Sequence, residues 1–498
     1  MVRHANVTDF LLEGKDPDAP ALRTLQGDCN YGELAQIVER IAYNLVREEP
    51  KGNRAILIAE NSLFWVSAYL AVIKAGLICV PLPVTVSPED LEYISSVTGA
   101  TTAFVQSRFR AGRASQLSRL RVITENSPIG HGSGAVPPTA EPDDLAAIMF
   151  TSGSTGKPRG VMVTHANIIA NTESIVQYLH LTARDRIMTV LPFHYCFGTS
   201  LLHTHLRAGA SLVIDPRFLY PEVVLRRMAE TECTGFAGVP SHFQILLRRS
   251  TLKRRAFPHL RYVQQAGGHL APVFIRELRK ALPHTQIFVM YGQTEATARL
   301  SYLPPEFLDT KIGSIGKGVP GVDLEVLNAV GRPVAPGEIG EIVATGDNVT
   351  RGYWCSPEES MHSFREGRLY TGDLATVDPD GFIYVVDRTK DFLKCGGERI
   401  SCRHIEDRLL ENEDLLEAAV IGVPDEVYGE AVRAYVVPRG PGCNGQCRWP
   451  VCRGVKDGIL QFCKTHLPLK LIPREIVVMA ALPKNSAGKV VKAGLKGL

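Results

Sequence analysis

The chain has 498 residues, too many for one hydrophobic core, which predicts two to four domains or subdomains. Hydrophobic residues make up 45% and charged residues 21%, as in a globular enzyme, and 55 basic against 52 acidic residues leave a net charge of +3. This balance gives no reason to expect a nucleic-acid or membrane-surface partner.

The N-terminus has no apolar core of the signal-peptide kind, and the longest apolar stretch, residues 68–84, is too short and too broken to span a bilayer. The 11 cysteines are mostly scattered singly. Without an export signal, we expect them to be reduced thiols in a cytoplasmic protein.

The first hydrophobic patterns along the chain are typical of alternating helices and strands. Residues 31–48 have an amphipathic helical pattern, 54–59 a buried strand, 62–75 a helix and 77–82 another strand. Strand, helix and strand at this spacing predict βαβ units in a mostly parallel sheet, and the pattern recurs through 180–290.

The pattern of predicted secondary structure changes twice after residue 290. From about 312 to 387 short strands with many glycines predict a small β-rich subdomain, and from about 390 to 498 helices alternate with strands again. The predicted fold is therefore α/β: a large N-terminal domain of mostly parallel βαβ sheets with a small β subdomain, followed by a smaller α+β domain.

The segment 149–160 gathers hydroxyls, glycines and a lysine into one turn, a composition suited to binding phosphate oxygens. It is not a Walker A loop, because Thr151 stands where the first glycine belongs and Pro158 follows Lys157. Proline disfavours a helix at Lys157, and the β-type run after it predicts a loop between two strands. The predicted phosphate-binding residues are Thr151, Ser152, Gly153, Ser154, Thr155, Gly156 and Lys157.

This loop resembles the signature of the adenylate-forming enzymes, the superfamily of acyl-CoA synthetases and firefly luciferase, residue for residue. Four further segments resemble that family's motifs in the expected order, and together they extend the resemblance over essentially the whole chain. They are Tyr-Gly-Gln-Thr-Glu-Ala at 291–296, Tyr-Thr-Gly-Asp at 370–373, Asp-Arg-Thr-Lys-Asp at 387–391, and Leu-Pro-Lys-Asn-Ser-Ala-Gly-Lys at 482–489.

The resemblance implies roles for individual residues. Lys489 would be the catalytic lysine, Thr294 would bond the α-phosphate, and Glu295 would help to hold Mg²⁺. Asp373 would bind the ribose, with Arg388 as a second ribose or phosphate contact. The remaining implied nucleotide contacts are Gly267, Gly268, Tyr291, Gly292 and Gln293.

The resemblance also places a joint at 387–391, with Lys390 as the hinge. It implies a large domain of residues 1–388, with the β subdomain at 312–387, and a mobile lid domain of residues 389–498. Gly396, Gly397 and Glu398 resemble the turn that faces the thiol in the second half-reaction.

The segment from Pro192 to Gly198 resembles the family's acyl-pocket segment. His194 stands where amino-acid-activating relatives usually carry an aspartate, and the sequence has no acidic residue between Leu191 and Arg207. A buried ammonium without a carboxylate is costly, so we expect a carboxylic acid other than an α-amino acid. The expected pocket residues are His194, Tyr195, Phe197, Gly238 and Gly267.

Two other patterns are weaker. Residues 316–321 fit G-x-G-x-x-G, but the strand-like 323–327 follows where a dinucleotide site needs a helix. Cys443, Cys447 and Cys452, with Cys463 and His466 further on, fit no common zinc spacing, and a metal or redox role for them stays open.

Taken together, the sequence predicts an AMP-forming acid–thiol ligase that uses ATP, Mg²⁺ and coenzyme A. One alternative acceptor is the phosphopantetheine of an acyl carrier protein, for which the basic run 448–456 offers a docking surface. A non-catalytic binding protein on the same scaffold is a third possibility. The particular acid, the acceptor and the oligomeric state stay open.

Overall fold

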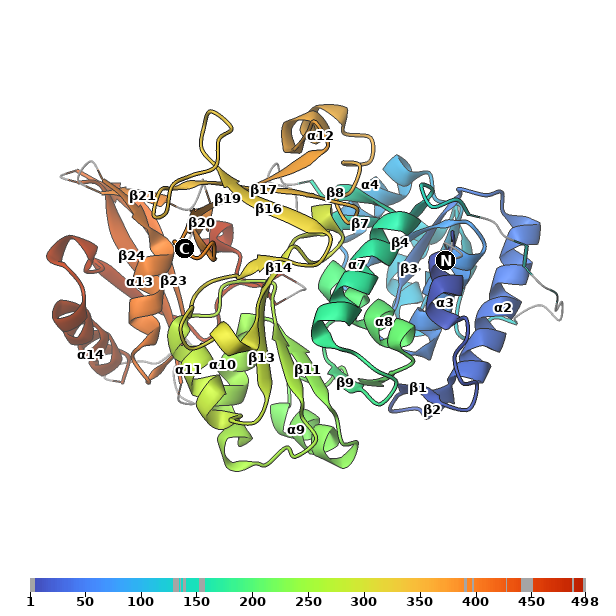
Figure 1. The fold of residues 1–498 in the computed structure, drawn as a ribbon, viewed down its shortest axis with the longest axis horizontal. Coiled ribbons are helices and arrows are strands. Elements are labelled where there is room, and N and C mark those ends of the chain that lie inside the picture. Colours follow the sequence, from blue (N-terminus) through green and yellow to red (C-terminus); the bar gives the residue numbers. More distant parts are fainter. Residues whose placement is uncertain are drawn as a thin grey trace.

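The computed structural model describes residues 5–128, 134, 136–137, 140–151, 157–388, 392–395, 398–426, 428–439, 451–485 and 488–495. Its strands form four sheets (Figure 1). The α/β fold class predicted from the sequence is confirmed, with a larger N-terminal part and a smaller C-terminal part.

The first large sheet has six strands in the order β6-β5-β3-β4-β7-β8. Its strands are β3 (Arg54–Ile58), β4 (Ile78–Leu82), β5 (Thr102–Val105), β6 (Arg121–Ile123), β7 (Leu145–Thr151) and β8 (Arg159–Thr164). All neighbouring pairs are parallel except β7 and β8, which pair antiparallel with Thr151 opposite Arg159. The predicted phosphate loop therefore joins two adjacent strands, as expected. The helices of this region are α2 (Tyr31–Glu48), α3 (Leu63–Lys74), α4 (Pro88–Thr98), α5 (Ser107–Arg110) and α6 (Ala114–Leu117).

The second large sheet has nine strands in the order β15-β14-β13-β12-β11-β9-β10-β1-β2. Its strands are β1 (Pro20–Arg23), β2 (Asp28–Asn30), β9 (Arg186–Thr189), β10 (Ser211–Ile214), β11 (Gly235–Gly238), β12 (Tyr262–Gln265), β13 (Gln286–Tyr291), β14 (Ser301–Leu303) and β15 (Lys317–Gly318). Its helices are α1 (Val7–Leu12), α7 (His165–Leu179), α8 (Cys196–Ala208), α9 (Pro221–Glu230), α10 (Pro240–Arg249) and α11 (Pro272–Ala281).

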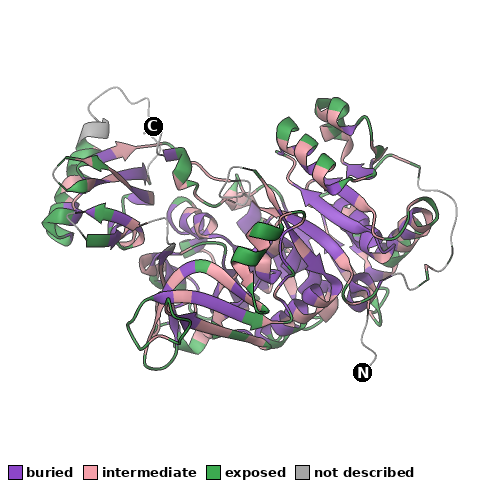
Figure 2. Ribbon diagram, turned by 90° about the horizontal axis from the view of Figure 1, so that it is seen from above, coloured by how far each residue is buried: buried purple, intermediate pink, exposed green. Residues whose placement is uncertain are grey.

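One hydrophobic core joins these two sheets. It contains α3, α7 and α8 together with the facing residues of β3, β4, β9 and β12, and Figure 2 shows its strands as mostly buried. The helix and strand periods seen in the sequence at 31–48, 54–59, 62–75 and 77–82 are confirmed within one or two residues by α2, β3, α3 and β4. Helix α2 begins with a capping box, in which Asn30 and Glu33 bond each other's backbone N–H groups.

Two smaller sheets complete the fold. The β-rich region contains β16 (Val322–Leu327), β17 (Gly340–Gly346), β18 (Phe364–Arg365), β19 (Arg368–Val377) and β20 (Ile383–Arg388), with α12 (Pro357–Ser363). The C-terminal region contains β21 (Phe392–Cys395), β22 (Glu398–Ser401), β23 (Leu415–Asp425), β24 (Gly429–Pro438) and β25 (Glu475–Val478), with α13 (Cys402–Leu410) and α14 (Val451–His466). Strand β16 follows the G-x-G-x-x-G segment, so the helix that a dinucleotide site needs is not formed there.

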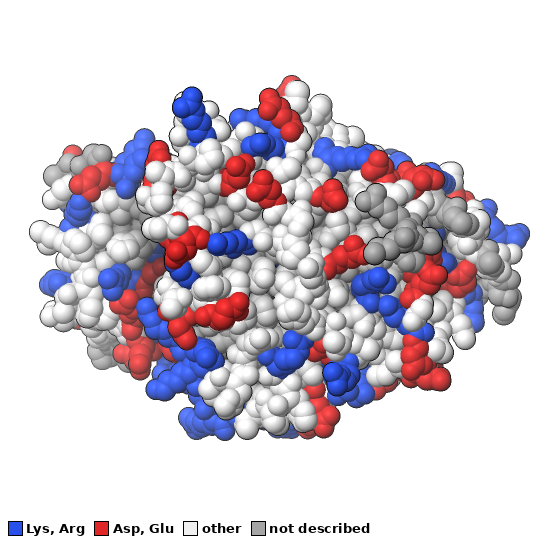
Figure 3. Space-filling view, in the orientation of Figure 1, with Lys and Arg blue, Asp and Glu red and all other residues white. Residues whose placement is uncertain are grey.

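Charges of both signs are interspersed over the face drawn in Figure 3. None of the described helices is long and apolar enough to cross a membrane. The eight described cysteines that carry free thiols include Cys463, which is buried in the C-terminal core. The described residues hold no group of three potential metal-ligating side chains; Cys443, Cys447 and the side chain of Cys452 lie outside them.

Three histidines, His165, His203 and His205, are buried, and His194 and His242 are half-buried. Desolvation lowers their pKa values from 6.5 to about 3 for His194 and His203 and to about 4 for His165, His205 and His242. Because the unfolded chain binds protons first, the free energy of unfolding should fall as the pH drops below 6.5 toward 4, by up to about 1.4 kcal/mol per pH unit for each histidine.

We expect His203→Gln to flatten the plot of melting temperature against pH over this window. The exposed His404 gives the control, His404→Gln, and equal slopes for both variants would contradict the assignment.

Candidate active site

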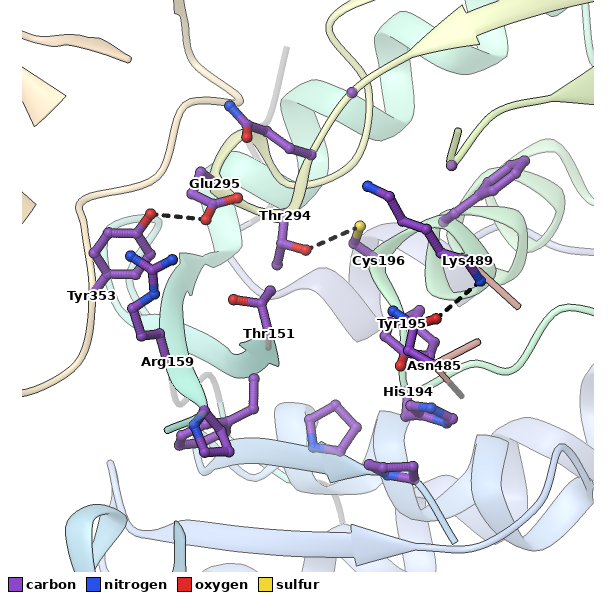
Figure 4. A pocket seen from close by; sticks show the side chains of 18 of the residues that line it. Thr151, Arg159, His194, Tyr195, Cys196, Thr294, Glu295, Tyr353, Asn485 and Lys489 are labelled. Carbon is purple, nitrogen blue, oxygen red and sulfur yellow. Dashed lines mark hydrogen bonds between the residues drawn. The ribbon is translucent and has the colours of Figure 1, made fainter. Parts of the chain in front are cut away.

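A cavity of about 920 Å³ opens where the two large sheets, the β-rich region and the C-terminal segment meet. It is lined by the end of β7, the start of β8, the start of α8, the segment after β13, and the turn that contains Asn485 and Lys489. Figure 4 shows these side chains converging from elements far apart in the sequence. The predicted site residues that line it are Thr151, His194, Tyr195, Phe197, Gly267, Gly292, Gln293, Thr294, Glu295 and Lys489.

The segment after β13 turns sharply into the cavity. A Cβ on Gly292 would lie 2.0 Å from the carbonyl oxygen of Ala298, so only glycine fits. The short 3-10 helix Thr294–Ala296 follows and presents two polar side chains to the cavity. The Thr294 hydroxyl donates to the Cys196 sulfur over 3.4 Å, at the first residue of α8.

Glu295 is held by Tyr353, a residue that the sequence analysis did not single out. The Tyr353 hydroxyl donates to Oε1 of Glu295 over 2.8 Å, and Arg159 lies over the Tyr353 ring at 5.0 Å. Burial, followed by the Glu295 charge, raises the pKa of Tyr353, so the phenol stays a donor. Glu295 lines the cavity, and one carboxylate together with water and phosphate oxygens suits ligation of Mg²⁺ there.

Lys489 enters the cavity from the end of the chain. Gly488, with φ +76°, turns the backbone there, and its carbonyl accepts from the Ser241 hydroxyl of α10 over 3.2 Å. The Asn485 side chain accepts from the Lys489 N–H over 3.0 Å and closes the turn. The Lys489 side chain extends from this turn toward Thr294 and Cys196 (Figure 4).

A second cavity of about 440 Å³ adjoins the first at Gly267, Gly292 and Lys489. The predicted ribose residue Asp373 and Gly268 line this second cavity, and Asp373 accepts from the Tyr291 hydroxyl over 2.6 Å. Some of the predicted nucleotide residues therefore line one cavity and some the other, and the two cavities share three lining residues.

Other predicted residues lie elsewhere. Gly238 is not among the described residues that line either cavity, and a Cβ there would press on His242 and Phe243 at 3.1 Å. Lys157 is exposed, with its ammonium 5.4 Å from the centre of the Tyr93 ring. The described part of the chain does not include Ser152 to Gly156, Lys390, Gly396, Gly397 or the side chain of Arg388. Glu398 is exposed and forms an ion pair with Lys470.

The acyl-pocket segment is neutral. His194 is packed against Tyr195 with ring centres 4.4 Å apart, and burial lowers the pKa of His194 to about 3. The carboxylates that line the large cavity, Asp90, Glu295 and Glu341, come from other elements.

Several polar contacts join the C-terminal region to the rest of the molecule. The His269 Nε2 atom lies 2.9 Å from both carboxylate oxygens of Asp407 in α13. Arg403 donates to the Val385 carbonyl over 2.7 Å, and Arg248 of α10 donates to the carbonyls of Leu410 and Leu415. These contacts hold Lys489 beside the large cavity, and sequence spacing gave no sign of them because each joins distant residues.

The comparisons with known proteins agree with this geometry. The sequence model of the AMP-binding enzyme family matches residues 13–354, and that of the AMP-binding enzyme C-terminal domain matches residues 404–489. The chain therefore belongs to the family of AMP-binding, adenylate-forming enzymes.

Individual relatives resemble the chain over nearly its full length. It is 31% identical to a feruloyl-CoA synthase of Amycolatopsis sp over 96% of both chains, and 30% identical to an oxalate–CoA ligase of Arabidopsis thaliana over 96% of this chain and 95% of that one. The ATP-bound crystal structure of MatB from Rhodopseudomonas palustris matches with a TM-score of 0.87 at 30% identity, covering 99% of this chain and 98% of that one. The structure of O-succinylbenzoate coenzyme A synthetase of Bacillus subtilis, in complex with ATP and magnesium ion, matches with a TM-score of 0.85 at 28% identity, covering 99% of both chains.

The contact between Tyr353 and Glu295 yields a test of the metal site. We expect Tyr353→Phe to raise the Mg²⁺ concentration needed for half-maximal activity about tenfold, because the carboxylate loses a charge-assisted hydrogen bond worth about 1.5 kcal/mol. Titration of the reaction with MgCl₂ at fixed ATP measures this. Tyr43→Phe, which removes a surface phenol bonded to Arg47, is the control. An unchanged Mg²⁺ requirement for Tyr353→Phe would contradict the placement of the ion at Glu295.

Proposed function

We propose that this protein is an ATP-dependent acid–CoA ligase. It joins a small carboxylic acid to AMP, releases pyrophosphate and passes the acyl group to coenzyme A. The observation that carries the proposal is the convergence of Lys489, Thr294, Glu295 and the segment 194–197 on one cavity. Relatives named as ligases of coenzyme A with feruloyl, oxalate and long-chain fatty acyl groups support the same reaction.

The chemistry explains why this set of residues suffices. A carboxylate is a poor electrophile, because its leaving group would be oxide, whereas an acyl–AMP anhydride has a good leaving group. The first step must hold two anions, the carboxylate and the α-phosphate, in line and offset their repulsion. Lys489 supplies a cation that bridges them, and the Thr294 hydroxyl donates to the α-phosphate. Mg²⁺ held at Glu295 neutralises charge on the departing pyrophosphate when it is bound.

The proposed acid is not an α-amino acid. The wall formed by His194, Tyr195 and Phe197 is aromatic and carries no carboxylate to pair with an ammonium group. We also propose that the protein works in a reducing compartment such as the cytoplasm, because its described cysteines are free thiols.

The second half-reaction needs a different arrangement of the C-terminal region. We propose that residues 389–498 form a lid that turns about Lys390, so that Lys489 leaves and the turn at 396–398 approaches the thiol. The contacts of Asp407 with His269 and of Arg403 with the Val385 carbonyl would break in this motion.

The direct test is ATP–pyrophosphate exchange across a panel of carboxylic acids, followed by assay of acyl transfer to coenzyme A. Acid-dependent exchange and a coenzyme A thioester product are expected. Transfer only to the pantetheine arm of a carrier protein would show that the acceptor is a carrier protein and not coenzyme A. Exchange only with α-amino acids would refute the proposed substrate class.

Lys489→Ala should lower adenylation by about three orders of magnitude or more and leave ATP binding largely intact, because the ammonium acts on charge that develops in the transition state. Exchange kinetics and a nucleotide-binding titration measure the two effects separately. Lys464→Ala on the exposed face of α14 is the matched control. Near-normal exchange by Lys489→Ala would refute the catalytic assignment.

Lys390→Pro should spare adenylation and slow thioester formation, because proline restricts the backbone at the proposed hinge. Single-turnover measurement of acyl-AMP formation and of its consumption by coenzyme A separates the two steps. Equal loss of both steps would argue against a hinge at this residue.

A further inference from the structure

Arg299 is an interior cation with incomplete bonding. It lies five residues after Thr294, is 1% exposed, and its Nε donates to the Tyr178 hydroxyl of α7 over 3.3 Å. The guanidinium stacks 4.6 Å from the centre of the Phe197 ring. Its Nη2 has no acceptor in the part of the chain that the structure describes.

Two other arginines that stack on aromatic rings each have a carboxylate partner. Arg248 stacks on Phe274 and pairs with the Glu277 carboxylate at 2.9 Å. Arg261 stacks on Tyr262 and pairs with Asp185 at 3.0 Å. Arg299 has the same stacking on a ring, yet among the described residues no carboxylate lies within ion-pair distance of it.

This arrangement is energetically unusual. A guanidinium keeps its charge inside proteins, so burial cannot be relieved by loss of a proton. An uncompensated buried charge costs several kcal/mol, of which one phenol and one ring face recover only a part. An anion beside Arg299 would complete its bonding, and the planar guanidinium matches a carboxylate in two parallel hydrogen bonds.

The place of Arg299 connects it with the proposed acyl pocket. Phe197, whose ring stacks on the guanidinium, lines the large cavity, and so does its neighbour Cys196. Cys196 also lines a small cavity of about 20 Å³ together with Ala298 and Asn171, and the Asn171 amide donates to the Arg299 carbonyl over 3.0 Å. Arg299 itself is not among the described residues that line either cavity, and it adjoins the large cavity through the Phe197 ring.

The sheet on which Tyr178 packs also carries two buried polar side chains without described partners. Tyr178 packs on Phe288 with ring centres 6.0 Å apart, and Phe288 is in register with Gln264 on the neighbouring strand. The Gln264 amide is fully buried, and neither its nitrogen nor its oxygen is bonded to a described residue. The Thr189 hydroxyl, two strands further along the sheet, is also fully buried and has no described hydrogen-bond partner.

We propose that Arg299 binds a second carboxylate of the substrate, so that the activated acid is a dicarboxylic acid. The inference rests on the proposed function and specifies its substrate class. One carboxylate lies at Lys489 and Thr294, where it reacts, and the other reaches Arg299 once the Phe197 ring turns aside. Arg299 is a specificity-determining residue in this account, and its charge also disfavours substrates with an ammonium group at that end.

The test compares matched pairs of acids in ATP–pyrophosphate exchange: butanoate with succinate, hexanoate with adipate, and benzoate with the three benzenedicarboxylates. We expect the wild-type protein to prefer at least one diacid over its matched monoacid by about tenfold or more in kcat/KM. Arg299→Met, which keeps an apolar side chain against Phe197, should lower kcat/KM for that diacid about 100-fold, since charge-assisted bonds are lost. It should change the monoacid value by no more than about threefold.

Arg261→Met is the matched control, because it removes an arginine that also stacks on a ring but already has a carboxylate partner. It should leave the ratio of diacid to monoacid unchanged. A wild-type preference for every monoacid, or an equal loss of both substrates in Arg299→Met, would overturn the proposal and leave Arg299 a structural residue. If Arg299→Met does not fold, the wild-type preference decides the matter by itself.

A binding measurement separates this inference from the proposed function. The preferred diacid alone, without ATP, should raise the melting temperature of the wild-type protein more than its matched monoacid does. Stabilisation by a diacid without any exchange would refute the ligase and support the site. Exchange with monoacids only, and no stabilisation by diacids, would refute the site and support the ligase.

Discussion

The proposed reaction depends on one feature of the structure, the turn that places Lys489 in a cavity built by residues far earlier in the chain. The two reacting groups are both anions, so a cation has to lie between them. Gly488 provides the positive φ, Ser241 anchors its carbonyl to α10, and Asn485 closes the turn. These contacts fix the turn, and in the proposed lid motion the lysine would leave the cavity together with the C-terminal region.

The cavity owes its shape to the rest of the fold. Parallel strands bring the segments after β11, β12 and β13 to one edge, where such sheets bind ligands. Close packing behind that edge, as between Gly292 and the Ala298 carbonyl, leaves no room for a side chain and turns Thr294 and Glu295 toward the cavity. Arg299 stacks on Phe197, which lines the cavity, so the proposed diacid site would join the cavity to the protein interior.

Sequence patterns predicted those features that depend on neighbouring residues. Helical and strand periods located α2, β3, α3 and β4, and Pro158 indicated that the phosphate loop joins two strands. Contacts between distant residues left no local signal: Tyr353 lies 58 residues from Glu295, and Asp407 lies 138 residues from His269. Arg299 was missed for a related reason, because an arginine beside a loop motif is ordinarily solvated, and only the packing of α7 and α8 buries it.

The central claim is that the acid is activated by attack of its carboxylate oxygen on the α-phosphate of ATP. The most direct measurement uses an accepted acid labelled with ¹⁸O in both carboxylate oxygens, with mass spectrometry of the nucleotide product after full conversion to the thioester. The account predicts that AMP acquires one ¹⁸O atom per turnover and that pyrophosphate stays unlabelled. Unlabelled AMP, or label in inorganic phosphate accompanied by ADP, would contradict it.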